Sequence, residues 1–181
     1  MDYEVRKATL DDRDAIAQLI AESARRLSRN EYSDEQIESA VASIFGVDTD
    51  LIDDETYYVA EKDGMLIGCG GWSRRKKLYG GDQFSPQDAG YLDPEHDPAR
   101  IRSFFVHPQH ARKGVAGEML SVCEREALAH GFRALELMAT LPGIKFYEAS
   151  GFARKGFFDL VLPDGVKIEF VPMRKELRRI D

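Results

Sequence analysis

Two apolar, strand-like stretches joined through one amphipathic helix constrain the fold of this chain most. Strands are predicted over residues 101–106 and 134–139, and the helix between them over 112–130, with Gly131 able to close it. Two such strands lie parallel in one sheet and are joined by a right-handed crossover. The chain is therefore predicted to contain a β-α-β unit.

The turn before this helix is suited to bind an anion. Gly114 and Ala116 leave little side-chain bulk at the start of the helix, and Arg112 and Lys113 add positive charge. A helix N-terminus has unpaired N–H donors and the positive end of the helix dipole, so a phosphate or pyrophosphate is predicted there. The turn lacks both the Gly-Lys-Ser/Thr ending of a nucleoside triphosphate loop and the three-glycine spacing of a dinucleotide site.

Two blocks of sequence resemble the GNAT (GCN5-related) N-acetyltransferase family. The turn reads Ala111-Arg112-Lys113-Gly114-Val115-Ala116 and resembles the family's acetyl-CoA motif, Arg/Gln-x-x-Gly-x-Gly/Ala, with alanine at the first position. The second block reads Phe146-Tyr147-Glu148-Ala149-Ser150-Gly151-Phe152 and resembles the family's Phe-Tyr-Glu-x-x-Gly-Phe. This block also predicts a short helix from Pro142 to Ser150, with Gly151 at the C′ position.

Periodicity in the rest of the chain predicts further elements. The strands are expected at 3–8, 56–61, 65–73, 152–162 and 166–173, with the pair around Asp63-Gly64 forming a tight hairpin. A first helix follows Thr9 and Asp12 and has an apolar face of Ile16, Leu19, Ile20 and Leu27. A second helix follows a capping box of Ser33 and Gln36. Residues 47–55 are predicted to be an acidic loop and 174–181 a fraying tail.

The resemblance implies an α/β GNAT fold. In this fold a central mixed, mostly antiparallel β-sheet is flanked by helices, and one β-α-β parallel pair is splayed at the acetyl-CoA site. The chain of 181 residues is predicted to be one domain over its whole length. Residues 76–98, where the periodicity breaks down, are predicted to be an insertion or flap.

Composition excludes several classes of protein. A net charge of -7 argues against general nucleic-acid binding, and the absence of a long apolar run argues against a membrane partner. Cys69 and Cys123 have no metal-ligand spacing, so they are predicted to be reduced core thiols in a cytoplasmic protein. His107 and His110 lack a third ligand of the right kind nearby, so no metal site is predicted.

The resemblance implies that an amine attacks acetyl-CoA directly in a ternary complex. Tyr147 is then the general acid that protonates the departing thiolate, and backbone N–H groups near Val106 stabilise the oxyanion. The residues expected to bind acetyl-CoA are Phe105, Val106, Ala111, Arg112, Lys113, Gly114, Val115, Ala116, Thr140 and Phe146.

The sequence assigns neither the general base nor the identity of the acceptor amine. The strand at 101–106 contains no carboxylate, so no general base is assigned. Glu95, His96 and Asp97 lie just upstream, where a water chain to any of them would serve, but the favoured interpretation of each is a residue of a solvated loop. The acceptor is predicted to be a small-molecule amine, selected by the first two helices and the insertion, whose acidic residues are Asp82, Asp88, Asp93, Glu95 and Asp97. A non-catalytic acyl-CoA-binding domain and a protein N-acetyltransferase are the alternatives, and both a monomer and a homodimer remain open.

Overall fold

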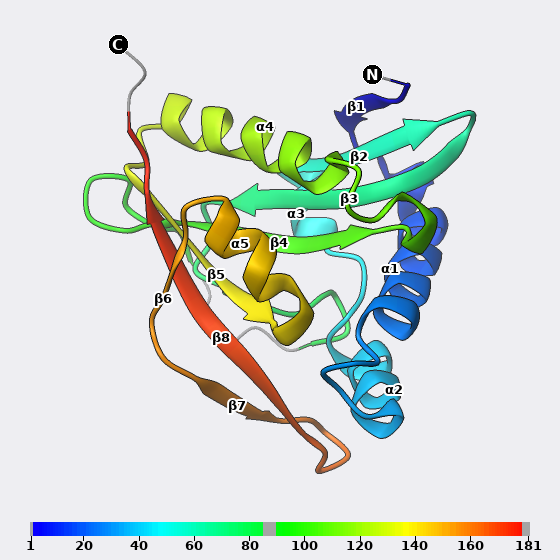
Figure 1. Cartoon of the computed structure of the whole chain (residues 1–181). Coiled ribbons are helices and arrows are strands. Elements are labelled where there is room, and N and C mark those ends of the chain that lie inside the picture. The colour runs from blue at the N-terminus through cyan, green and yellow to red at the C-terminus, as the bar shows by residue number, and fades with distance from the viewer. Residues whose placement is uncertain (1, 85–89, 179–181) are drawn as a thin grey trace.

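A mixed β-sheet with helices on both faces forms the centre of the structure (Figure 1), a computed structural model that describes residues 2–84 and 90–178. The strands are β1 (Glu4–Lys7), β2 (Tyr57–Lys62), β3 (Met65–Ser73), β4 (Ala99–Val106), β5 (Ala134–Thr140), β6 (Ala153–Arg154), β7 (Phe158–Val161) and β8 (Lys167–Glu176). The helices are α1 (Arg13–Leu27), α2 (Asp34–Ser43), α3 (Thr49–Asp53), α4 (Val115–Ala129) and α5 (Ile144–Ala149), with 3₁₀ turns at Leu10–Asp12, Pro108–His110 and Leu141–Gly143.

The sheet order is β1-β2-β3-β4-β5-β8-β6, and β7 also pairs with β8. Strands β4 and β5 are parallel, whereas the other pairs found in the described residues are antiparallel. The parallel ladder consists of Ala99 with Leu135 and Arg100 with Glu136, and the two strands diverge beyond it (Figure 1). The predicted β-α-β unit with a splayed parallel pair is therefore confirmed.

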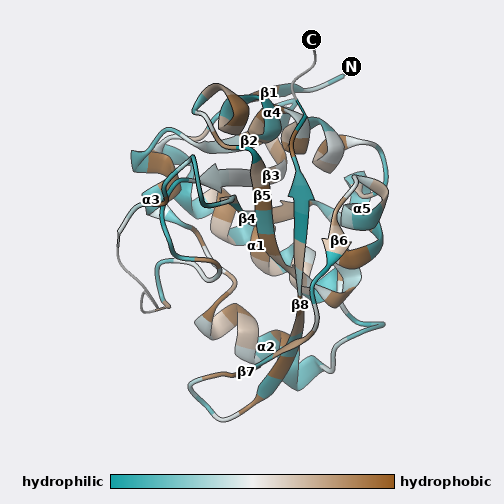
Figure 2. Cartoon of the chain, turned by 90° about the vertical axis from the view of Figure 1, so that its left-hand side faces the viewer, coloured by the Kyte–Doolittle hydropathy of each residue, from teal (hydrophilic) through white to brown (hydrophobic). Residues whose placement is uncertain are grey.

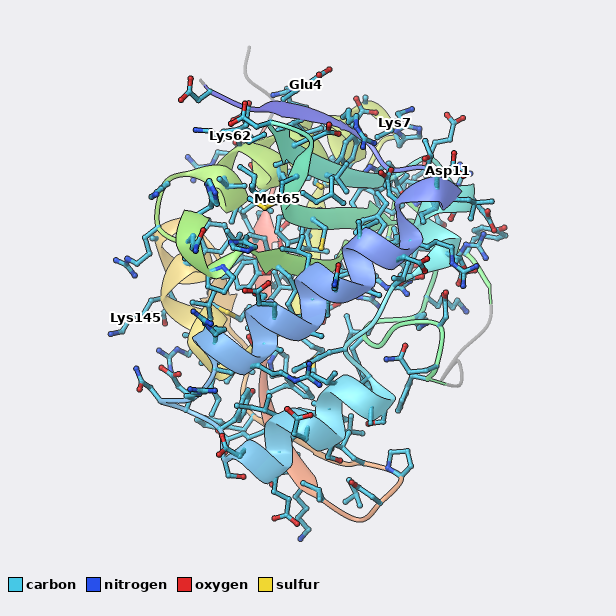
Figure 3. The ribbon with its side chains drawn as sticks, turned by 90° about the vertical axis from the view of Figure 1, so that its right-hand side faces the viewer. Glu4, Lys7, Asp11, Lys62, Met65 and Lys145 are labelled. Atoms are coloured by element: carbon cyan, nitrogen blue, oxygen red, sulfur yellow. The ribbon has the colours of Figure 1, made fainter. Side chains whose placement is uncertain are left out.

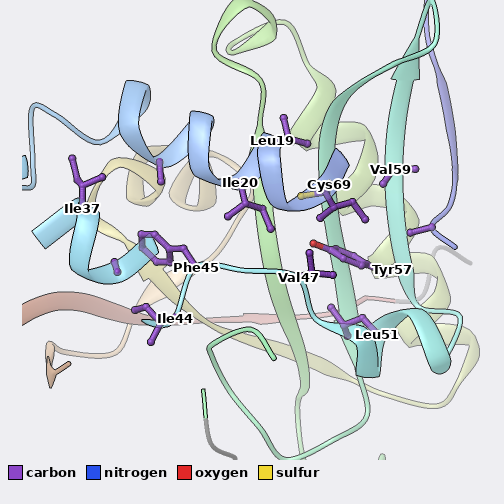
Figure 4. Close-up of a cluster of buried hydrophobic side chains, with 14 of the residues drawn as sticks. Leu19, Ile20, Ile37, Ile44, Phe45, Val47, Leu51, Tyr57, Val59 and Cys69 are labelled. Atoms are coloured by element: carbon purple, nitrogen blue, oxygen red, sulfur yellow. The ribbon is translucent and has the colours of Figure 1, made fainter. Parts of the chain in front are cut away.

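Separate apolar cores lie on the two faces of the sheet. One core packs α1 and α2 against the sheet, and Figure 4 shows Ile20 of α1 and Ile37 of α2 beside Phe45. The other core packs α4 and α5 against the opposite face and includes Cys123 and Tyr147. Burying apolar area on both faces is what fixes the positions of β4 and β5.

Several local predictions are confirmed. The Gln36 N–H donates to Ser33 Oγ at 3.1 Å and the Ser33 N–H donates to Gln36 Oε1 at 2.9 Å, which is the predicted capping box. Asp63 and Gly64 have φ values of 50° and 77°, as a tight hairpin turn requires. Gly151 has φ 92° and follows α5, and the Phe152 N–H donates to the carbonyl oxygen of Tyr147 at 3.0 Å.

Other predictions are wrong at particular residues. The helix predicted from Arg112 begins at Val115, because Arg112 and Gly114 have φ values of 62° and 88° that no α-helix accommodates. The predicted acidic loop contains α3, which is held in place by the burial of Leu51 and Ile52. Leu27 is 38% exposed and does not belong to the apolar face of α1.

The C-terminal hairpin also differs from its prediction. The strand predicted over 152–162 is interrupted between β6 and β7, where Gly156 has φ 118°. Strand β8 extends to Glu176, into the predicted tail, because it pairs with β5 as far as Ala134. Figures 1 and 2 show the β7–β8 hairpin next to α2, where Ser39 Oγ donates to Asp164 Oδ2 at 2.6 Å.

Candidate functional site

The carboxyl ends of β4 and β5 lie at the same edge of the sheet and form the candidate site. Phe105 and Val106 end β4, and Thr140 ends β5. Because the parallel ladder stops at Arg100 and Glu136, the facing edges of the two strands beyond this point have no ladder partners in the described chain. Backbone N–H and C=O groups there are available to a ligand that enters between the strands.

The glycine turn lies next to this gap, between the end of β4 and the start of α4. A Cβ atom placed on Gly114 or on Gly117 would meet no atom within 4 Å, so both positions face open space. Arg112 and Lys113 are exposed. The first N–H groups of α4 have no partner within the helix, and together with these two cations they make the start of α4 electropositive, which suits a pyrophosphate.

His107 connects this turn to the rest of the fold. Its backbone N–H donates to the Ile67 carbonyl at 2.9 Å, and its Nδ1 accepts from the Gln109 N–H at 3.2 Å. Its Nε2 lies 3.5 Å from Glu22 Oε2 of α1. Figure 3 shows α1 crossing the sheet close to the β2–β3 hairpin, which carries Lys62 and Met65. Helix α1 thus contacts the turn through Glu22 and His107, on the face of the sheet opposite α4.

Tyr147 lies on α5, near the end of β5. Its side chain is buried between the rings of Phe146 and Phe152, with centroid distances of 5.0 Å and 5.6 Å. Burial, with a smaller contribution from Cys123, raises the pKa of Tyr147 above its ordinary value. Within the described residues its hydroxyl has no hydrogen-bond partner.

Gly143 allows Tyr147 to approach the end of β5. A Cβ atom at Gly143 would lie 3.3 Å from Thr140 Oγ1 and 3.3 Å from a ring carbon of Tyr147. A larger residue would push the two apart. The structure therefore brings Thr140, Tyr147 and the half-buried Phe146 together at the end of β5.

The upstream residues considered as general bases are placed elsewhere. The turn at 93–97 is closed by its own hydrogen bonds, including His96 Nδ1 with Asp93 Oδ2 at 2.9 Å and the Asp93 N–H to Asp97 Oδ2 at 2.8 Å. This turn precedes Ala99, at the opposite end of β4 from Val106. An eight-residue strand spans roughly 25 Å, so a direct proton transfer from the strand end to this turn is out of reach.

The described part of the insertion is fastened to α3. Asp82 Oδ1 accepts from the backbone N–H and the hydroxyl of Thr49 at 2.8 Å and 3.0 Å. Just before the insertion, Arg75 pairs with Asp54, the residue after α3, at 2.7 Å. Within the insertion, Lys77 Nζ donates to the Gly81 carbonyl at 3.0 Å. Asp88, which the sequence places among the acidic residues of this segment, lies outside the described residues.

Sequence reasoning missed a buried ion pair on β4. Arg102 of β4 pairs with Asp48, which precedes α3, and their side chains are 1% and 0% exposed. Burial lowers the pKa of Arg102 to about 10, so the guanidinium stays charged at neutral pH. The strand pattern shows an arginine in an apolar run, which is a signal for a buried charge, but nothing in the sequence identifies its partner 54 residues away.

Residues 2–84 and 90–178 contain no group of three His, Cys, Asp or Glu side chains arranged to hold a metal ion. Among the same residues, no helix is both long and apolar enough to cross a membrane.

A mixed sheet with a splayed parallel pair, a glycine turn before α4 and a buried tyrosine on α5 define the architecture of the chain. A model of the acetyltransferase (GNAT) family matches residues 14–152, so the chain belongs to that family. No curated protein matches the chain.

Solved structures with the same fold are distant in sequence. A GCN5-related N-acetyltransferase from Rhodopseudomonas palustris is 19% identical with a TM-score of 0.73, covering 98% of this chain and 97% of that one. PaiA N-acetyltransferase from Thermoplasma acidophilum, solved with coenzyme A, is 17% identical with a TM-score of 0.66 and coverages of 97% and 99%. The yncA protein of Salmonella typhimurium, solved with acetyl-CoA, is 17% identical with a TM-score of 0.62 and coverages of 100% and 97%. These similarities show that the chain has the GNAT fold.

Proposed function

We propose that this protein transfers an acetyl group from acetyl-CoA to the amine of a small molecule. The observation that carries the proposal is the separation of β4 from β5 directly beside the glycine turn, which leaves backbone donors for a long, anion-bearing ligand. Membership of the GNAT family supports it, as do the related structures that contain coenzyme A or acetyl-CoA.

In this proposal the donor binds along three regions. The pyrophosphate contacts the backbone N–H groups of the segment from Ala111 to Ala116 and the side chains of Arg112 and Lys113. The pantetheine arm lies in the gap and pairs with the free edge of β4 at Phe105 and Val106. Thr140 and Phe146 line the opposite wall, so the thioester reaches the neighbourhood of Tyr147.

The chemistry is a direct transfer with balanced protons. The amine enters without charge, and its nitrogen forms a C–N bond to the thioester carbon. Backbone N–H groups near Val106 stabilise the oxyanion, a kind of contact worth about 10²- to 10³-fold in rate. The C–S bond then breaks and the thiolate takes the proton of Tyr147. The nitrogen releases its surplus proton to water, and water restores the tyrosine.

The remaining parts of the proposal concern the acceptor and the setting. Residues 76–98 select the small-molecule amine, within a chain that acts as one domain over residues 1–181. Cys69 and Cys123 are buried free thiols, which supports a reducing, cytoplasmic environment.

The experiment that tests the proposal measures thiol release from acetyl-CoA by the purified protein against a panel of small amines, with acetylated product confirmed by mass spectrometry. Release that depends on one class of amine is the expected result. Tight binding of CoA without release from any amine or peptide would identify a non-catalytic acyl-CoA-binding domain. Release only with peptides would identify a protein N-acetyltransferase.

A further inference from the structure

Arg102 has a buried guanidinium that is only partly paired. Its Nη2 bonds Asp48 Oδ2 and lies 3.5 Å from the Gly80 carbonyl oxygen. Its Nε and Nη1 are buried and have no hydrogen-bond partner among the described residues, and the same is true of Asp48 Oδ1. Nε of Arg100, whose Nη1 pairs with Glu136, is a third buried nitrogen of this kind. Buried polar atoms nearly always have partners, so three such nitrogens on one strand require an explanation.

The position of Arg102 on β4 shows which face of the sheet its side chain occupies. Arg100 is the last residue of β4 that pairs with β5, and Arg102 lies two residues further, where the strands have begun to separate. Side chains two apart on a strand point to the same face, so both arginines face α1 to α3 rather than α4. Farther along, beyond a bulge at Ser103 with φ 57°, Phe105 packs on Phe45 of that same face. This is the face opposite α4, on which α1 and α2 pack.

The chemistry of the unpaired edge favours one kind of group. A guanidinium presents its N–H donors as a planar fork that matches both oxygens of a carboxylate. Asp48 engages Nη2 and leaves the buried Nε and Nη1 without a partner among the described residues. A ligand group with a single acceptor atom would satisfy fewer of these donors.

Besides Asp48, the hydrogen-bond contact found for Arg102 among the described residues is a long one to the Gly80 carbonyl. The Gly80 carbonyl lies at 3.5 Å, the long limit of a hydrogen bond, and Leu78, Tyr79 and Gly80 are themselves half-exposed. A carboxylate oxygen at the usual charge-assisted distance of about 2.8 Å makes a much stronger contact than this carbonyl does. An anionic acceptor can therefore replace the carbonyl.

We propose that Arg102 is a specificity-determining residue that binds a carboxylate of the acceptor, so that the substrate is an amine that also carries a carboxylate. Arg100 adds a second donor to this subsite. The inference rests on the proposed acetyl transfer. Four residues along a strand span roughly 13 Å between Arg102 and Val106, so the number of bonds between amine and carboxylate is part of the specificity.

The test compares acceptors that differ only in the carboxylate. Thiol release from acetyl-CoA is measured with ω-amino carboxylates from glycine to 6-aminohexanoate and, for each, the alkylamine of the same length without the carboxylate. At the best length kcat/KM is expected to be at least about tenfold higher for the amino carboxylate. No preference at any length would overturn the proposal.

The variants are chosen to keep the interior neutral. Removing Arg102 alone would leave the buried carboxylate of Asp48 without its ion-pair partner. The double variant Arg102→Gln, Asp48→Asn is therefore used, with folding checked by circular dichroism. In this variant the ratio of kcat/KM for the amino carboxylate to kcat/KM for the alkylamine is expected to fall to about 1, because KM for the amino carboxylate rises. The value of kcat/KM for the alkylamine should change much less. Arg102→Lys should restore part of the preference, and Arg25→Gln on the exposed side of α1 should leave it intact. An equal loss for both acceptors in the folded double variant would mean a purely structural pair.

A failure of the proposed function is distinguishable from a failure of this subsite. If no amine releases thiol, 6-aminohexanoate and hexylamine are titrated by calorimetry into the CoA-loaded protein. Tighter binding of 6-aminohexanoate that the double variant loses would support the carboxylate subsite without acetyl transfer. Equal binding of the two probes would overturn it.

Discussion

The proposed acetyl-CoA side and the proposed acceptor side of the gap, called the donor side and the acceptor side below, are built in different ways. The donor side uses backbone groups of one continuous segment, from Val106 through Gly114 to the first turn of α4. The acceptor side uses charged side chains from distant segments, with Arg102 of β4 paired to Asp48 and Asp82 bonded to Thr49. A backbone site depends on glycine and helix geometry, whereas a side-chain site depends on tertiary packing. The two sides should therefore respond differently to substitution.

The largest expected effect is on the donor side, from Gly114→Glu. The variant puts bulk and negative charge where backbone and pyrophosphate meet, and like charges brought together cost several kcal/mol. The dissociation constant for CoA should rise by about 1,000-fold or more, measured by calorimetry. Gly64→Glu is the matched control, since Gly64 also has a positive φ and open space at its Cβ. Unchanged CoA affinity in folded Gly114→Glu protein would remove the turn from the donor site.

Tyr147→Phe should separate chemistry from binding. The ring and its contacts with Phe146 and Phe152 remain, so CoA affinity should be retained while kcat falls by about 10- to 1,000-fold. Tyr58→Phe is the control, because Tyr58 is another buried tyrosine of the same core and lies on β2. Equal kcat values for parent and Tyr147→Phe, with chemistry rate-limiting, would show that Tyr147 only packs.

The pH dependence sharpens the assignment of Tyr147. Burial disfavours the phenolate and raises the pKa of Tyr147, so the proton donor is lost only above the ordinary tyrosine value of about 10. The kcat profile measured from about pH 6 to 10.5 should therefore show no decline from this group below about pH 10. A decline near pH 8 or 9 that disappears in Tyr147→Phe would contradict the burial argument.

The contrast between a backbone site in one continuous segment and a side-chain site from distant segments also explains what the sequence can predict. The glycine turn, the Asp63-Gly64 hairpin and the Ser33 capping box depend on residues within a few positions of one another, and each lies where the pattern indicates. Local backbone rules are sufficient for such features. The residues of the donor side can for this reason be proposed from the sequence alone.

The acceptor side cannot be located in this way. Helix α3 has an acidic sequence typical of a loop, and tertiary contacts stabilise it: Leu51 and Ile52 are buried, and Thr49 is hydrogen-bonded to Asp82. Arg102 and Asp48 meet because β4 and the segment before α3 pack together, which periodicity does not reveal. The start of α4 differs from its prediction for a smaller reason, since a pattern cannot show that Arg112 takes φ 62°.

A moderate effect is expected on the acceptor side from Asp82→Ala. The substitution removes the two hydrogen bonds that tie the insertion to Thr49, so the amine's KM should rise several-fold while the dissociation constant for CoA stays within about twofold. Asp93→Ala is the control within the same segment, because the carboxylate of Asp93 bonds to Glu95 and His96 of its own turn. A parallel loss of CoA affinity would show that the two sides are not independent.

The smallest effect is expected at Tyr32, which lies where the two sides meet. Its hydroxyl donates to the Glu169 carbonyl at 2.6 Å and accepts from the Leu141 N–H at 2.9 Å, joining the α1–α2 connection to the ends of β5 and β8. Tyr32→Phe leaves both backbone groups without this partner and should lower the free energy of unfolding by about 1 to 3 kcal/mol. Urea denaturation measures this change, with exposed Tyr91→Phe as the control. Because Tyr32 acts through position rather than through a proton, kcat should change by less than about threefold. A fall in kcat as large as that of Tyr147→Phe would mean that Tyr32 also takes part in the chemistry, and the division between a donor side and an acceptor side would have to be redrawn.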